Sequence, residues 1–252
     1  IEFHDPRMPS QPSERQRSAA SVAMSAVLAF DCAISGLGAA IVRDGSCLAS
    51  MREEGRDQAA GLFPALEAVL RDAGIGRREL SLIAVTVGPG SFTGVRLGLA
   101  AARGLALGLG VPLAGITTTS VLISQAMTQA PARGRLVVAA VDSRLGDWFC
   151  AIGEGTQSPF AAAVAELAGR LRNRPCVVVG PGIGPLVAQL SRAGIDVAAM
   201  EAYPDPVMVA RLGIAPGVES WREDNRRDGL PGPLYLRGVS VTLPDGARRT
   251  VD

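Results

Sequence analysis

A glycine-rich turn between two apolar segments constrains this chain more than any other feature. Residues 88–94 read Gly-Pro-Gly-Ser-Phe-Thr-Gly, directly after the apolar run 82–87 and before an apolar stretch that ends at Leu109. Glycine permits positive φ and close backbone approach, and Ser91 or Thr93 can accept hydrogen bonds from the free N–H groups of a helix start. The pattern therefore predicts a buried strand, a tight turn and a helix, as in an α/β fold.

Two interpretations of this turn stay open. A helix N-terminus carries partial positive charge and free donors, so a phosphate or nucleotide is expected to contact the set Asp31, Gly88, Gly90 and Ser91 if it binds here. The spacing matches neither the dinucleotide fingerprint nor the Walker A loop, which needs Lys before Ser or Thr. A capped turn is favoured over an anion site, and Asp31 is favoured as the cap of its own turn over a ligand of a phosphate-bound metal.

The helix predicted from Phe92 to Leu109 carries only two charges, Arg96 and Arg103. Small residues recur on it every four positions, at Gly94, Gly98 and Ala102 and again at Ala100, Gly104 and Gly108. Each interior glycine costs up to about 1 kcal/mol relative to alanine, so several of them indicate close packing on more than one side. The favoured partner is a second subunit and the alternative is an internal helix. The predicted interface comprises Thr93, Gly94, Arg96, Leu97, Gly98, Ala101, Ala102 and Leu105.

The two halves of the chain open in the same way. Residues 27–30 form an apolar strand that ends at Asp31 before a hairpin, and residues 136–141 form one that ends at Asp142 before a turn. This repeat predicts a duplicated α/β fold of the actin, Hsp70 and sugar-kinase (ribonuclease H-like) type, with two mixed-sheet domains flanked by helices. The expected division is a disordered or vector-derived leader over 1–23, an N-terminal domain over 24–131, and a C-terminal domain with its tail over 132–252.

Composition argues against several classes of function. The one histidine, His4, lies in the leader, which leaves no His-based metal site and no Ser–His or Cys–His pair in the folded part. The four cysteines are widely spaced, as buried thiols rather than a disulfide or zinc framework would be. The net charge of +1 argues against a broad basic surface for nucleic acid. Residues 104–132 carry no charge, but Pro112 interrupts them, so we expect buried core in a cytoplasmic protein and no membrane contact.

Several further features are interpreted as structural. The second turn, Gly180-Pro181-Gly182, is expected to join a strand to a helix without binding phosphate, because Pro181 removes a donor. Trp148 and Trp221 are expected to be packing residues, since no aromatic series supports base stacking. The basic residues of the tail, expected to be solvated, are Arg222, Arg226, Arg227 and Arg237.

The motif Gly88–Arg96, with its continuation through Ala100 and Ala106, resembles the central motif of the TsaB (YeaZ) family. Leu28-Ala29-Phe30-Asp31 resembles the opening strand of that family, Val141 to Trp148 its second hairpin, and Pro233 to Arg237 its C-terminal Pro-x-Tyr-Leu-Arg. The series spans about residues 26–244 in the family's order, although residues 153–217 contribute little.

The resemblance implies the two-domain actin-like fold and a place in bacterial tRNA modification. It implies a non-catalytic subunit that binds TsaD, the transferase, together with the ATPase TsaE, and that forms a homodimer when alone. No cofactor of its own is implied; ATP or ADP is expected only at the level of the complex, and contact with tRNA is expected to be indirect or weak.

This chain departs from the family pattern at two places, with Asp31-Cys32 where relatives often have Asp-Thr and without the frequent histidine near Gln58. The alternative function is an independent ATPase or small-molecule kinase of the same fold. A peptidase is disfavoured because the sequence offers neither a nucleophile–base pair nor metal ligands.

Overall fold

The first sheet of the molecule is built around strands that are apolar over their whole length. The computed structural model describes residues 26–55, 57–129, 134–153, 158–172 and 174–237, and the backbone of 239–242 and 248–251. The sheet has the order β3-β2-β1-β4-β5. Its strands are β1 (Ala26–Asp31), β2 (Leu37–Arg43), β3 (Ser46–Glu53), β4 (Leu80–Thr86) and β5 (Leu113–Ile116). β2 lies antiparallel to β1 and β3, while β1, β4 and β5 run parallel.

Helices cover both faces of this sheet, which explains why β1 and β4 do not alternate between apolar and polar residues. Leu28 and Phe30 of β1 pack with α2 (Gln58–Ala73) and α3 (Phe92–Leu109) on one face. Val27 and Ala29 pack with α7 (Pro206–Ile214) on the other face, where α8 (Val218–Asp228) also contributes. The short 3₁₀ helix Arg77–Glu79 leads into β4.

The second sheet repeats this plan. Its order is β10-β9-β6-β7-β8, so the first strand of each half lies between its second and fourth strands. The strands are β6 (Leu136–Asp142), β7 (Trp148–Ile152), β8 (Phe160–Ala162), β9 (Cys176–Gly180) and β10 (Val197–Glu201). α5 (Val164–Leu171) and α6 (Gly184–Arg192) cover one face, and α4 (Thr118–Met127) covers the other. The predicted duplicated fold of two mixed sheets flanked by helices is confirmed.

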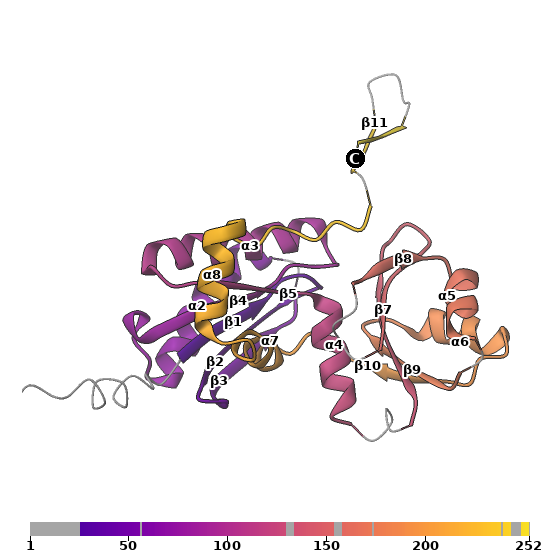
Figure 1. The fold of residues 1–252 in the computed structure, drawn as a ribbon, viewed down its shortest axis with the longest axis horizontal. Coiled ribbons are helices and arrows are strands. Elements are labelled where there is room, and N and C mark those ends of the chain that lie inside the picture. Colours follow the sequence, from indigo (N-terminus) through magenta and orange to yellow (C-terminus); the bar gives the residue numbers. More distant parts are fainter. Residues whose placement is uncertain are drawn as a thin grey trace, which may run out of the picture.

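Two helices lie between the sheets and hold the units together. α4 contacts β6 of the second sheet, α7 contacts β1 and β2 of the first, and the two helices contact each other (Figure 1). Gln125 of α4 donates to the carbonyl of Tyr203 at 3.0 Å and accepts from the N–H of Asp205 at 3.0 Å. The chain therefore crosses between the units twice, once through α4 and once before α7.

The chain after β10 differs from the expected division of domains. Residues from Pro206 onward were expected to belong with the second domain, but α7 and α8 lie on the first sheet. α7 is apolar and covers the face that α2 and α3 leave open, which is the physical reason for the return. The expected boundary near Ala130–Gly134 stays a prediction because residues 130–133 lie outside the described part, as does the leader 1–23.

α8 protects the exposed edge of the first sheet. The N–H of Leu113 in β5 donates to Asn225 Oδ1 at 2.7 Å, and Asn225 Nδ2 donates to the carbonyl of Leu113 at 3.0 Å. This side-chain amide occupies the free backbone groups of an edge strand, which would otherwise be open to pairing with another chain. Trp221 also donates to the carbonyl of Gly213 at 2.7 Å, and Trp148 is buried in the second core, so both tryptophans are packing residues as predicted.

β11 (Val239–Thr242) and β12 (Arg248–Val251) form a separate antiparallel pair beyond the second crossing. Within the described residues, α3 is the one helix whose length and composition would allow it to cross a membrane, and its sheet-facing side is buried.

Candidate functional site

The turn at 88–94 is a capped, tightly packed connection. Ser91 Oγ accepts from the N–H of Gly94 at 3.2 Å, which confirms that Ser91 caps α3. The N–H of Ser91 donates to the carbonyl of Ala33 at 2.6 Å, and the same carbonyl would overlap a Cβ placed on Gly90. Gly88 has φ of 101°. The glycines therefore allow the turn to approach the loop after β1, as the favoured interpretation requires.

Asp31 lies beneath this turn in the core. Its Oδ1 accepts from the N–H of Ala33 at 3.0 Å and from Thr86 Oγ1 at 2.6 Å. It thus caps the turn after β1, as predicted. Its Oδ2 has no hydrogen-bond partner, and burial raises the pKa of this carboxyl against the opposing effect of the Thr86 hydrogen bond. Asp31 is 1% exposed, so a ligand on the surface would meet the turn and not this side chain.

The second half contains the same two features, an aspartate that caps the turn after its first strand and a glycine-rich turn from strand to helix. Neither provides an open anion site. Asp142 Oδ1 accepts from the N–H of Arg144 at 2.8 Å, as Asp31 does from Ala33. At the turn 180–182, the carboxylate of Glu201 accepts from the N–H groups of Gly182 at 2.8 Å and Ile183 at 3.1 Å. An internal carboxylate therefore occupies the start of α6, in agreement with the prediction of a plain strand-to-helix turn.

The predicted interface on α3 divides into two sides. Gly94, Gly98, Ala101 and Ala102 are buried against the protein's own sheet. A Cβ on Gly94 would overlap the carbonyl of Cys32, and one on Gly98 would lie 3.4 Å from Cys32 Cβ. For these four residues the partner prediction is wrong, because the small side chains let α3 approach β1 and β4. Thr93 and Arg96 are exposed, and Leu97 and Leu105 are half-buried.

The second ridge of small residues faces solvent. Ala100, Gly104 and Gly108 are exposed, and a Cβ on either glycine would have open space around it. Leu107, on the same side, is 72% exposed. An apolar helix with an uncovered glycine ridge is a surface on which another helix could pack closely. We call the residues Thr93, Arg96, Ala100, Gly104, Leu107 and Gly108 the outer face of α3.

A C-terminal segment borders the outer face, and it contains the stretch Pro233–Arg237 that resembles the family's Pro-x-Tyr-Leu-Arg motif. Arg103 Nη2 donates to the carbonyl of Pro231 at 2.7 Å, and the N–H of Leu234 donates to the carbonyl of Val87 at 2.8 Å. Arg96 Nε donates to the hydroxyl of Tyr235 at 2.7 Å. We call residues 230–237 the strap.

An aromatic–cation cluster fixes the strap at its far end. The guanidinium of Arg96 lies 3.5 Å from the ring centre of Phe92, and that ring lies 5.9 Å from the ring of Tyr235. Arg237 then forms an ion pair with Asp147 of the second unit. The pairing of Arg103 and Arg96 with the tail could not be predicted, because neither residue carries a local signal for a partner more than 100 positions away.

A cavity of about 670 Å³ opens between the two units. The turn contributes Gly90 and Ser91, the second hairpin contributes Ser143 and Arg144, and the strap contributes Tyr235 and other residues. Its volume suits a small ligand of nucleotide size. Of the residues predicted to contact phosphate, Gly90 and Ser91 line this cavity, whereas Asp31 and Gly88 do not.

Three of the four thiols are buried, as predicted, and are poorly suited to nucleophilic chemistry, whereas Cys47 is exposed and the prediction of burial is wrong for it. Burial raises the pKa of Cys32 and of Cys150 to about 12, and it also raises the pKa of Cys176. A thiol is nucleophilic as its thiolate, so these three side chains are held in the unreactive form. In the described ranges no three His, Cys, Asp or Glu side chains are grouped as a metal site would require.

The family model for TsaD, tRNA N6-adenosine threonylcarbamoyltransferase, matches residues 52–185, which is more than half of the chain. The matched range contains the turn, α3 and most of the second sheet.

Curated relatives agree with this match. The chain is 33% identical over 125 residues to the tRNA threonylcarbamoyladenosine biosynthesis protein TsaB of Escherichia coli, which covers 50% of this chain and 53% of that protein. It is 32% identical over 97 residues to TsaB of Bacillus subtilis (38% and 42%). It is 30% identical over 145 residues to the tRNA N6-adenosine threonylcarbamoyltransferase of Erythrobacter litoralis (55% and 41%). The chain spans about half the length of the curated relatives that it matches.

Solved structures show the same fold. A protein from Pseudomonas aeruginosa described as similar to the peptidase YeaZ superposes with a TM-score of 0.65 at 24% identity, covering 85% of this chain and 100% of that one. YeaZ from the same organism superposes with a TM-score of 0.62 at 23% identity, covering 84% and 100%.

Proposed function

This chain belongs to the family defined by the TsaD model, tRNA N6-adenosine threonylcarbamoyltransferase, and on that premise we propose that it is a TsaB (YeaZ)-like member, a non-catalytic partner subunit of the complex that attaches threonylcarbamoyl to tRNA. In this proposal it acts in the cytoplasm by binding the transferase TsaD, with TsaE as a further component. The modified position is the adenosine next to the anticodon in tRNAs that read codons beginning with A.

The outer face of α3 is the observation that carries the proposal. It combines a 72% exposed leucine with glycines that leave the helix backbone uncovered. Arg96 is its one charged residue, and Phe92 and Tyr235 hold that side chain in place. A rigid apolar surface with a polar rim has the composition of a subunit interface. The family model that matches this chain is that of the transferase itself, which supports a common fold for the two proteins. The occupant that we propose for this face is TsaD, packing through a helix of that common fold.

The chemistry of the described residues supports an accessory role. The buried thiols are held protonated, and the turn that resembles a phosphate loop is occupied by its own capping contacts. We therefore propose no cofactor for this chain alone and place ATP or ADP at the level of the complex. The proposed contact with tRNA is secondary to the contact with TsaD.

Co-purification and reconstitution test this proposal. The chain should co-elute with TsaD, and omitting it from a mixture of TsaD, TsaE, tRNA, ATP and threonylcarbamoyl-adenylate should abolish most of the modification. Gly104→Arg should prevent co-elution without lowering the melting temperature, because open space surrounds the new Cβ. Gly184→Arg, at an exposed and equally open helix position in the second unit, is the matched control. Modification that proceeds equally well without this chain would refute the proposal.

A homodimer through the same face is a further expectation for the isolated chain. Size-exclusion chromatography should then show a dimer that Gly104→Arg converts to a monomer. A dimer that survives this substitution would show that the outer face of α3 is not the surface used.

The cavity between the units favours one alternative, an independent ATPase or small-molecule kinase. Its volume of about 670 Å³ suits a nucleotide, and Arg144 and Arg237 line it. Calorimetry with Mg-ATP on the isolated chain separates the two functions. Micromolar binding by the chain alone would favour the kinase, and binding only after TsaD is added would favour the partner subunit.

A further inference from the structure

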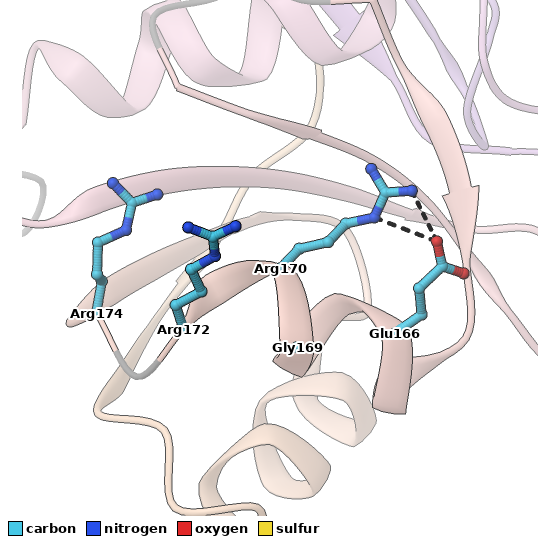
Figure 2. Close-up of a pocket in the computed structure, with 5 residues that line it drawn as sticks. All are labelled: Glu166, Gly169, Arg170, Arg172 and Arg174. Atoms are coloured by element: carbon cyan, nitrogen blue, oxygen red, sulfur yellow. Dashed lines mark hydrogen bonds and ion pairs between the residues drawn. The ribbon is translucent and has the colours of Figure 1, made fainter.

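A group of arginines at the end of α5 has no role in the proposal above. Arg170, Arg172 and Arg174 line a surface cavity of about 570 Å³ together with Glu166 and Gly169. Figure 2 shows the side chains of Arg172, at the end of the helix, and Arg174, in the chain beyond it, extending in the same direction, while Arg170 turns toward Glu166. The group lies on the second unit, apart from both α3 and the cavity between the units.

Arg170 is held in a fixed position. Its Nε and Nη2 donate to Glu166 Oε1 at 3.2 and 2.7 Å, and its guanidinium lies 4.1 Å from the ring centre of Phe160. The carboxylate neutralises this one arginine. The charge that remains in the cavity is therefore that of Arg172 and Arg174.

Within the described ranges these two arginines form no ion pair, unlike most other arginines of the second unit. Arg135 pairs with Asp196, Arg144 with Asp142 and Arg237 with Asp147. Glu201 is engaged with the start of α6. Among the described residues, Arg172 and Arg174 have no hydrogen-bonding or ion-pairing side-chain partner, although the neighbouring Arg170 does. Two exposed like charges beside one another repel weakly in water, and a bound anion would remove this repulsion.

The backbone of Arg172 has an unusual conformation for this residue type. It ends α5 with φ 49° and ψ 43°, a left-handed conformation that glycine adopts at much lower cost. An arginine here directs a long cationic side chain into the cavity from a position where local structure alone favours glycine.

We propose that Arg172 and Arg174, with Arg170 beside them, bind phosphate groups of a tRNA backbone. The guanidinium fork matches phosphate oxygens, and open, exposed arginines suit a backbone contact that does not depend on base sequence. The choice of tRNA rests on the proposed function, since the relatives are named for tRNA modification. The site would be a secondary contact that positions tRNA while the reaction takes place on the transferase.

Fluorescence anisotropy with labelled, unmodified tRNA and the full chain tests the assignment. Replacing both residues, as Arg172→Gly with Arg174→Gln, should weaken binding roughly tenfold in low salt and reduce the slope of log K against log salt by about 2. The glycine relieves the left-handed position, so the melting temperature should not fall. A purely structural role, in which the arginines stabilise the C-terminal end of α5, predicts a lower melting temperature and unchanged tRNA affinity.

Gly169 offers a matched pair of variants in the same cavity. It is exposed and has open space around a new Cβ, so Gly169→Glu and Gly169→Gln differ only in charge. The glutamate should weaken tRNA binding severalfold and the glutamine should not. Equal affinities for these two variants, or an unchanged salt slope in the double arginine variant, would overturn the assignment.

Pyrophosphate distinguishes a free phosphate ligand from tRNA. If the double arginine variant loses pyrophosphate binding but keeps its tRNA affinity, the cavity binds a small anion and the tRNA assignment is wrong. These measurements use the chain alone, so they can succeed even if TsaD does not co-elute. Conversely, co-elution with TsaD and full modification by the arginine variants would leave the proposed function standing and refute only this inference.

Discussion

Asp31 shows what a single buried carboxylate contributes at the residue scale. Its Oδ2 has no hydrogen-bond partner, and burial raises its pKa above the ordinary value of about 3.8. Above that pH the unfolded chain releases a proton that the folded chain retains. Stability is therefore lost as the pH rises from about 3.8 through the raised pKa of the folded state.

Asp31→Asn should remove this pH dependence. The asparagine Oδ1 can keep both accepted hydrogen bonds, from Ala33 and Thr86, but cannot ionise. Thermal melts from pH 3.5 to 8 should show the variant gaining stability relative to the natural sequence as the pH rises through this window. Asp44→Asn, at an exposed turn, controls for the loss of one carboxylate. A difference between Asp31→Asn and the parent that does not change with pH would contradict the buried, proton-binding carboxyl.

The four cysteines should differ sharply in reactivity. Cys47 is exposed, whereas the pKa of Cys32 and of Cys150 is about 12, so roughly 10⁻⁴ of each buried thiol is ionised at pH 8. A thiol titration of the native chain at pH 8 should count one fast group, which Cys47→Ser removes. In guanidinium all four should react. A second fast thiol in the native chain would show that one of these core positions opens to solvent.

At the scale of elements, the glycines of α3 provide a test of which side meets the sheet. Gly94→Ala places a Cβ on the carbonyl of Cys32 and should lower the free energy of unfolding by more than about 2 kcal/mol. Gly104→Ala adds a Cβ in open space and should raise it by about 0.5–1 kcal/mol, because alanine favours the helix. Urea unfolding of both variants gives the comparison.

The same pair separates stability from partner binding. If the outer face of α3 packs on another helix, Gly104→Ala should weaken co-elution with TsaD while the chain itself becomes more stable. A Gly94→Ala variant as stable as the parent would mean that α3 does not lie against the loop after β1 as described.

The elements best predicted from sequence are those whose signal is local. The hairpin predicted after Asp31 turns at Arg43-Asp44-Gly45, with positive φ at Asp44 and Gly45. α3 begins and ends within the predicted range 92–109. The prediction did not include β8, α5, β10 or α8, because these elements are short or polar and their stability depends on packing. On α3 the sequence showed two small-residue ridges, but only the fold shows that Gly94 and Gly98 face inward.

At the scale of the whole molecule, the repeat was predictable from two strands that each end in an aspartate. The packing of α7 and α8 on the first sheet could not be predicted, because the apolar pattern of a helix does not indicate which of two sheets it will cover. The result is a molecule whose first unit is completed by its last helices, with α4 and α7 between the sheets (Figure 1). The strap then extends the chain from the first unit to Asp147 of the second.

Arg237→Ala should show how much this last connection contributes. Asp147 is 8% exposed, and the substitution leaves this buried carboxyl without its ion-pair partner, so we expect a loss of about 1–2 kcal/mol of unfolding free energy. Arg222→Ala breaks an exposed pair with Glu219 on α8 and should cost less than about 0.5 kcal/mol. Urea unfolding of the two variants compares a connection between units with an ordinary surface pair.

Amide hydrogen exchange shows which part of the chain is loosened when Arg237 is replaced. The Leu234 amide is bonded to the carbonyl of Val87 at 2.8 Å, directly before the glycine-rich turn. If Arg237 fixes the strap, Arg237→Ala should speed exchange at Leu234, and adding Tyr235→Ala should extend the change to Arg96 and the start of α3, which the tyrosine hydroxyl contacts. Equal exchange at Leu234 in Arg237→Ala and Arg222→Ala would show that the strap is held by its contacts to the first unit alone. The aromatic cluster at Phe92, rather than the ion pair, would then determine how firmly the turn and α3 are held together.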